Sequence, residues 1–188
     1  SALFSIPTDW PVAVYGVRLC RAAGNTITGS ISEGSVLDCS DWMAINNAEP
    51  WWAQGDKGRF VSRNSDGWIR VFGRSLAFDK SGCVDAEVLS KKTAASVRLV
   101  PVPVSFPAHF AGTSSAMSQL LLPPSTSSPV MLTTSARGSC FDLEAPIPTS
   151  VSPGLYTVEV LNGLPGSTWM AAGDGLALYL HPTPINPP

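Results

Sequence analysis

The chain has little charge and no long apolar run, and these two shortages limit what it can do. Charged residues make up 14% of its 188 residues, against about 25% in typical soluble domains. The formal net charge is −2 and no block of like charges occurs, which argues against nucleic acid and anionic membranes as partners. No apolar run approaches the roughly 18 residues of a transmembrane helix. The polar surface must therefore come mainly from Ser, Thr, Asn and Gln, as is common in secreted β-rich proteins.

Histidine is equally scarce, and with it the usual means of catalysis and metal binding. His109 and His181 are the two histidines of the chain, and neither has a carboxylate at a spacing typical of a catalytic pair. The sequence contains no G-x-S-x-G, H-E-x-x-H or glycine-rich phosphate-loop motif. Its scattered carboxylates lack the D-x-D-x-D spacing of a calcium loop. We therefore predict no catalytic residue, no metal site and no cofactor, and a protein that is not an enzyme.

Sustained helical periodicity is also missing, whereas strand signals recur along the whole chain. Gly and Pro number 16 and 17, and their even distribution interrupts any helix. Apolar and polar residues alternate most clearly at 68–76, a run that ends at Gly73, and at 155–161. We expect 68–73 and 155–161 to be interior strands. Four side chains on these strands are expected to be buried: Val71, Tyr156, Val158 and Val160. The regular spacing of turn signals favours an antiparallel sandwich over βαβ units.

Shorter runs of the same kind predict the remaining strands. They are expected at residues 10–20, 26–31, 35–39, 84–89, 96–104, 118–122, 130–135, 140–143 and 176–180. Residues 55–67 are expected to form a loop, because glycine, asparagine and charged residues are concentrated there.

The cysteines are even in number, widely spaced and free of any C-x-x-C pair: Cys20, Cys39, Cys83 and Cys140. Four cysteines allow three pairings. We predict the local one, Cys20 with Cys39 and Cys83 with Cys140, because it respects a division of the chain near residue 50. Disulfides would indicate an oxidising compartment and hence an extracellular location. The alternative is four buried thiols in a cytosolic protein.

Three segments carry a family resemblance: 49-EPWWAQGDKG-58, 67-GWIRVFGRSLAF-78 and 153-PGLYTVEVLNGLPGSTW-169. They resemble the immunoglobulin-like module of the IPT/TIG type that precedes right-handed parallel β-helix domains in pectate-lyase-like, secreted, polysaccharide-acting proteins. Val71, Gly73 and Leu76 match the V-x-G-x-x-L element of this type, and residues 153–163 match its P-G-x-Y-T-V-x-V-x-N-G element. Tyr156 near the start of the second element is expected to offer its hydroxyl to a loop, as a tyrosine-corner residue does.

The resemblance implies an all-β fold with an immunoglobulin-like antiparallel β-sandwich over residues 49–181. Residues 1–48 are expected to be an N-terminal β segment or a partial subdomain, and whether they belong to the main sandwich stays open. Residues 182–188 contain four prolines and are expected to be a connector to a further domain, because proline cannot donate to a strand ladder.

Tryptophan is the remaining signal for function. Trp51, Trp52 and Trp169 adjoin turns rich in glycine and aspartate and are candidates for a carbohydrate platform, because flat aromatic rings stack on sugar rings. The commoner role of such side chains is burial in a core or a domain interface. If the segment is extended, Trp51 and Trp52 point to opposite sides, so at most one of them lies in the core.

The function that we predict is a non-catalytic accessory or spacer module of a secreted or cell-surface, polysaccharide-associated protein. Its expected partners are a polysaccharide and a neighbouring domain. Two alternatives stay open: a structural or adhesive protein that assembles with copies of itself, and a free lectin-like domain.

Overall fold

The structure is a computed structural model that describes residues 7, 9–22, 36–62, 67–79, 82–83, 95–102, 128–132, 139–173 and 177–181. No helix occurs among these residues, and the prediction of an all-β fold is confirmed. The strands predicted at 26–31, 84–89 and 118–122, and the connector predicted at 182–188, lie outside the described residues.

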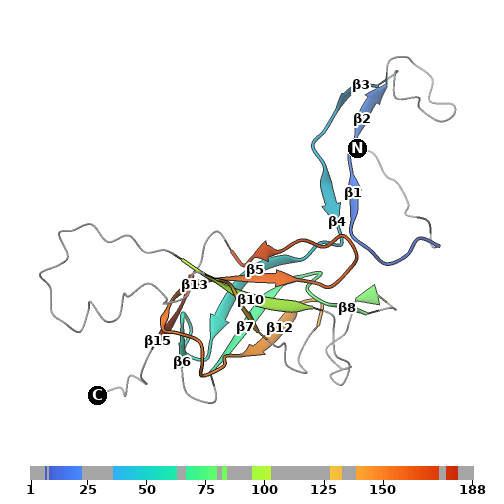
Figure 1. Cartoon of the computed structure of the whole chain (residues 1–188). Helices are drawn as coiled ribbons and strands as arrows, with labels where there is room; N and C mark the ends of the chain where they lie inside the picture. Colours follow the sequence, from blue (N-terminus) through green and yellow to red (C-terminus); the bar gives the residue numbers. More distant parts are fainter. Residues whose placement is uncertain are drawn as a thin grey trace, which may run out of the picture.

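Two larger sheets form the body of the protein (Figure 1). The six-stranded sheet has the order β11 (Val130–Leu132), β10 (Ser96–Pro101), β13 (Gly154–Leu161), β15 (Ala177–His181) and β6 (Phe60–Ser62), with β14 (Met170–Ala171) also pairing with β13. The three-stranded sheet has the order β12 (Asp142–Pro146), β7 (Trp68–Arg74) and β5 (Glu49–Gly55). Neighbouring strands are antiparallel except β15 and β6, which are parallel. A short hairpin joins β8 (Phe78–Asp79) to β9 (Gly82–Cys83).

Strand β6 corrects the prediction of a loop over residues 55–67. Val61 at its centre is fully buried, and the strand pairs with β15 from the far end of the chain. The local composition of residues 55–67 carries no trace of a partner that lies more than 100 residues away, which is why the sequence suggested a loop.

The buried faces of both sheets contribute to one apolar core. Along β7, the side chains of Ile69 and Val71 are fully buried, while the alternate residues Trp68, Arg70 and Phe72 are partly exposed. Strand β13 shows the same alternation, with Tyr156, Val158 and Val160 fully buried. Both strands have a neighbour on each side. The prediction of two interior strands with these buried residues is confirmed, whereas the immunoglobulin-like connectivity stays a prediction.

Tyr156 combines burial with one specific hydrogen bond. Its hydroxyl donates to the carbonyl oxygen of Ser152, four residues upstream, at 2.8 Å. This is the contact of a tyrosine corner, as predicted from the position of Tyr156. Burial of the ring raises the pKa of the Tyr156 phenol above its ordinary value of 10.0.

The variant Tyr156→Phe is expected to lower the free energy of unfolding by about 1 kcal/mol through loss of the hydroxyl's hydrogen bond. Because the folded state holds the phenolic proton more tightly, the stabilising effect of this group is complete below pH 10.0. It is lost as the pH rises through the raised pKa. Urea unfolding at several alkaline pH values should therefore show a steeper loss of stability for the unmodified chain than for the variant. An equal loss of stability with rising pH in the two proteins would contradict the role given to the buried Tyr156 hydroxyl.

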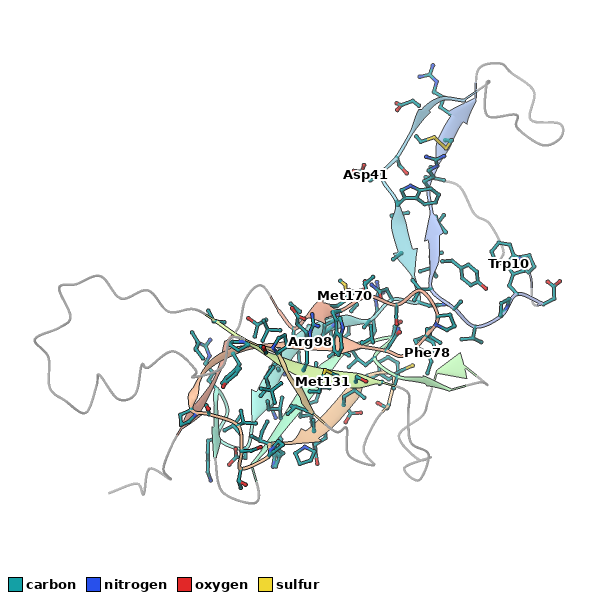
Figure 2. The ribbon with its side chains drawn as sticks, viewed as in Figure 1. Trp10, Asp41, Phe78, Arg98, Met131 and Met170 are labelled. Atoms are coloured by element: carbon teal, nitrogen blue, oxygen red, sulfur yellow. A yellow bond between two sulfur atoms is a disulfide. The ribbon has the colours of Figure 1, made fainter. Side chains whose placement is uncertain are left out.

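Four strands near the N-terminus form two short antiparallel pairs that lie apart from the two larger sheets. We call these two pairs the arm. Strand β1 (Tyr15–Val17) pairs with β4 (Met43–Ile45), and β2 (Cys20–Ala22) pairs with β3 (Val36–Cys39). A disulfide joins Cys20 to Cys39, which lie directly opposite each other, so this predicted pairing is confirmed. An isolated two-stranded hairpin is only marginally stable, and the crosslink compensates for that. Figures 1 and 2 show the arm standing out from the two sheets.

Hydrogen bonds tie the base of the arm to the body. The backbone nitrogen of Val14 donates to the carbonyl oxygen of Pro165 at 3.0 Å. The side-chain amide of Asn47 donates to Thr168 Oγ1 at 3.0 Å and accepts from the backbone nitrogen of Thr168 at 3.3 Å. The division of the chain near residue 49 therefore coincides with a hydrogen-bonded junction, and its status as a domain boundary stays a prediction.

The second predicted disulfide involves the body. Cys140 is buried and disulfide-bonded, and its carbonyl oxygen accepts from the backbone nitrogen of Leu76 at 3.0 Å. Cys83 lies on β9, and its side chain lies outside the described part. The pairing of Cys83 with Cys140 stays a prediction.

Candidate functional site

A β-bulge in β5 leaves both Trp51 and Trp52 exposed. The register of β5 on β7 shifts between Pro50, which lies opposite Gly73, and Trp52, which lies opposite Phe72. Trp51 is therefore an extra residue without a partner in the register, the mark of a bulge. The exposed fractions of Trp51 and Trp52 are 49% and 45%.

Of the commoner roles expected of these tryptophans, burial in the core does not apply to Trp51 or Trp52, whereas contact with a neighbouring domain stays a prediction. A regular strand would turn one of two adjacent side chains towards the core. The inserted residue interrupts that alternation, so neither Trp51 nor Trp52 is buried.

The two tryptophans belong to a row of aromatic and charged side chains on the solvent side of the three-stranded sheet. We call this surface the outer face and define it by Glu49, Trp51, Trp52, Gln54, Trp68, Arg70, Phe72, Arg74 and Glu144. The register places Glu49 opposite Arg74 and Trp52 opposite Phe72, and it places Gln54 and Glu144 on either side of Arg70. The rings of Trp52 and Phe72 have centroids 5.0 Å apart and planes inclined at 34°. They form one continuous aromatic surface.

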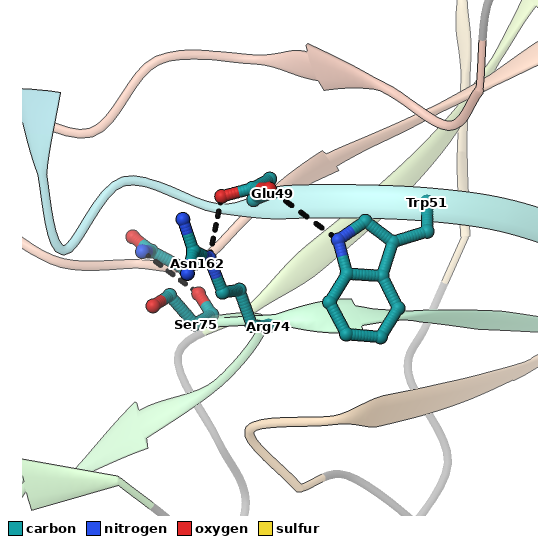
Figure 3. Close-up of polar contacts among 5 residues, drawn as sticks. All are labelled: Glu49, Trp51, Arg74, Ser75 and Asn162. Carbon is teal, nitrogen blue, oxygen red and sulfur yellow. Dashed lines mark hydrogen bonds and ion pairs between the residues drawn. The ribbon is translucent and has the colours of Figure 1, made fainter.

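Each arginine of the outer face is paired with a carboxylate on the next strand. Arg74 Nε lies 2.5 Å from Glu49 Oε2, and Arg70 Nη2 lies 2.5 Å from Glu144 Oε2. Glu49 has a second role, because its Oε1 accepts a hydrogen bond from Trp51 Nε1 at 3.4 Å (Figure 3). The ion pair and the indole contact together restrain the Trp51 ring beside β7.

A buried amide supports the end of β7 that carries Arg74. Asn162 is fully buried, and its Nδ2 donates to the carbonyl oxygens of Asn46 at 2.6 Å and Ser75 at 3.1 Å. Its Oδ1 accepts from the backbone nitrogen of Leu164 at 3.2 Å. Asn46 and Ser75 both have left-handed backbone angles, with φ of 66° and 55°. As Figure 3 shows, Asn162 holds Ser75 directly after Arg74, so it links the outer face to the base of the arm.

Trp169, the third predicted tryptophan, lies elsewhere. Its ring packs over Arg98, with the guanidinium carbon 4.2 Å from the ring centroid. Arg98 belongs to β10 of the six-stranded sheet and pairs with Glu159 on β13 at 2.5 Å. The predicted platform of three tryptophans thus divides between Trp51 and Trp52 on one sheet and Trp169 on the other.

Sequence reasoning missed Trp68, Phe72 and the two ion pairs of the outer face. Alternation along 68–74 placed Trp68 and Phe72 on one side of a strand, and this was the available signal. The partners of the ion pairs are 25 and 74 residues apart, so only the pairing of the strands brings them together.

The arm exposes large apolar side chains of its own, which we call together the arm surface. Its members are Leu19, Trp42 and Met43. The guanidinium of Arg18 lies 4.7 Å from the centroid of the Trp42 ring. A hollow of about 330 Å³ borders the disulfide and is lined by Leu19, Cys20, Arg21, Asp38, Cys39 and Ser40.

Neither surface contains the elements of a metal centre. Within the described ranges, no three His, Cys, Asp or Glu side chains gather closely enough to hold a metal ion. The same part of the chain contains no helix with the length and apolarity needed to span a bilayer. The chemistry available on the outer face is aromatic stacking and hydrogen bonding.

Comparison of the chain with protein-family models, curated proteins and solved structures finds no match. The resemblance to the IPT/TIG-type module therefore stays a prediction, and the function has to be argued from the geometry of the described residues.

Proposed function

We propose that this chain is a non-catalytic accessory module that binds a polysaccharide through the outer face. The observation that supports the proposal is the exposure of Trp51 and Trp52 next to Phe72, within rows of charged side chains. Sugar rings have apolar C–H faces that stack on aromatic rings, and hydroxyl groups that bond to carboxylates, amides and guanidinium groups. Small-molecule sites combine the same two elements, an aromatic surface and a few fixed polar groups.

The rigidity of the platform favours this role over a purely passive spacer. The outer face is built on three paired strands whose opposite side belongs to the core. The ion pairs and the indole contact restrain its side chains before any ligand arrives, which reduces the ordering cost of binding. The Cys20–Cys39 disulfide supports an extracellular location for the module, because such bonds persist in oxidising compartments.

The variant Trp52→Ala is expected to weaken polysaccharide binding by about tenfold or more, the equivalent of about 1.4 kcal/mol for one lost stacking surface. Affinity electrophoresis and titration calorimetry against soluble hydroxyethyl cellulose, glucomannan, xylan and polygalacturonate measure this. Trp42→Ala is the matched control, because Trp42 is exposed on the arm and should leave binding unchanged. A Trp52 variant that folds normally and binds as well as the unmodified chain would contradict the proposal.

The second candidate is a structural protein that assembles with copies of itself, and the arm surface favours it. Leu19, Trp42 and Met43 are large apolar side chains that the short strand pairs of the arm leave exposed, and exposed apolar area commonly marks contacts with other proteins. Sedimentation distinguishes the candidates. An accessory module is expected to remain at its monomer mass of 19.8 kDa, whereas an assembling protein forms oligomers that a Trp42→Ser, Met43→Ser double variant disperses.

A further inference from the structure

Guanidinium groups are the side chains best suited to bind the carboxylates of acidic sugars, because they form two parallel charge-assisted hydrogen bonds. On the outer face both guanidinium groups are already paired, Arg74 with Glu49 and Arg70 with Glu144. An acidic sugar would have to replace one of these carboxylates. It would also approach Glu49 and Glu144 themselves, which carry the same sign of charge.

The two pairs differ in how easily they could open. The side chains of Arg70 and Glu144 are 25% and 19% exposed, and separating a partly buried pair leaves a charge without its partner in a poorly solvated place. Those of Arg74 and Glu49 are 64% and 49% exposed, and such a surface pair alone contributes little to stability, because water screens both charges. The hydrogen bond from Trp51 to Glu49 adds a second restraint. Neither arginine is therefore a free anion site.

The aromatic part of the outer face suits uncharged sugars. A pyranose with mostly equatorial hydroxyl groups directs C–H bonds towards both ring faces, and these match the continuous surface of Trp52 and Phe72. Alternate residues of β7 from Trp68 to Arg74 lie along the same face, over a length of about 20 Å at the rise of a strand. That length accommodates several consecutive sugar rings.

We infer that the outer face takes a neutral polysaccharide of sugars with mostly equatorial hydroxyl groups, such as a β-linked glucan or glucomannan, in preference to a polyuronate. The inference rests on the proposed function, because it names the ligand class of the same surface. It goes beyond the expectation from the sequence, which named a polysaccharide as partner without its chemical class.

Binding of the full chain to hydroxyethyl cellulose, glucomannan, polygalacturonate and alginate tests the inference. The expected result is binding of a neutral polymer at least about tenfold tighter than of either polyuronate. The dissociation constant should change less than about twofold between about 20 mM and about 500 mM NaCl, because no new ion pair forms. Tighter, salt-sensitive binding of a polyuronate would overturn the inference and leave the proposed function standing. Binding of none of the four polymers would overturn both.

The variant Glu49→Gln tests whether the Arg74–Glu49 ion pair is what disfavours binding of a polyuronate. It keeps the Oε1 acceptor for Trp51 but removes the charge that neutralises Arg74. Affinity for polygalacturonate should rise about tenfold, since a guanidinium becomes available to its carboxylates. Asp41→Asn is the control, because it removes the same charge from an exposed position on the arm and should have no such effect. Equal affinities of the two variants for polygalacturonate would overturn the role assigned to the Arg74–Glu49 pair.

Discussion

Replacement of Asn162 by leucine is expected to lower the free energy of unfolding by about 4 kcal/mol, the largest effect that we expect of a single substitution. The amide of Asn162 contacts three backbone groups: the carbonyl oxygens of Asn46 and Ser75 and the nitrogen of Leu164. Leucine has a similar volume but no polar atom. A buried polar group that loses its partner costs about 1–3 kcal/mol, and both carbonyls belong to residues in the left-handed region, Asn46 and Ser75.

Urea unfolding followed by tryptophan fluorescence measures this effect. Asn47→Ala is the matched control, because the Asn47 amide also links segments 121 residues apart, but in an exposed setting. Its loss is expected to stay below about 1 kcal/mol, since water replaces the missing contacts. If Asn162→Leu were no more destabilising than the control, the buried amide would not be the junction described above.

Replacement of Gly73 by alanine is expected to lower the free energy of unfolding by about 3 kcal/mol, the upper part of the range for overpacking. An added Cβ would lie 2.3 Å from the carbonyl oxygen of Glu49 and 2.8 Å from the Cα of Pro50. Both are backbone atoms of β5, so the conflict can be relieved only by moving the strand. Because the bulge at Trp51 begins at Pro50, the same change should also disturb the outer face.

Two measurements test the role of Gly73. Urea unfolding gives the stability, and the binding assay for neutral polysaccharide is expected to show weaker binding by the variant. Gly16→Ala serves as the control, because there an added Cβ would meet the Trp42 ring at 3.1 Å, a flexible and exposed side chain that can shift. Similar stabilities of the two variants would show that β5 tolerates displacement at Pro50, contrary to the geometry.

Part of the candidate site could be predicted from local sequence. The dipeptide Trp51-Trp52 stood out as an aromatic pair beside a turn, and both residues are exposed. Trp169 was grouped with that pair because it also adjoins a turn rich in glycine and aspartate. The structure places Trp169 against Arg98 on the other sheet. A carbohydrate platform depends on which strands pair with one another, and strand pairing is decided by the tertiary structure.

The sequence by itself determined the all-β class, the two central strands and their buried faces, and the Cys20–Cys39 pair. Alternation along 68–73 and 155–161 is a local pattern, and one buried face follows directly from it. The position of Tyr156 near the start of a strand likewise allowed a hydrogen bond from its hydroxyl to a loop to be expected, and the structure identifies the partner as the carbonyl oxygen of Ser152. These features involve residues close in sequence, or a choice among few cysteine pairings.

Only the tertiary structure decided the exposure of Trp51, the strand at Phe60–Ser62 and the junction at Asn162. The bulge exists where β5 passes close to Gly73, β6 exists where β15 offers it an edge, and Asn162 acts on carbonyls 116 and 87 residues away. In each case the deciding interaction is made to a backbone group of a distant segment. Backbone groups are the same in every residue, so side-chain composition and periodicity do not reveal which of them will meet.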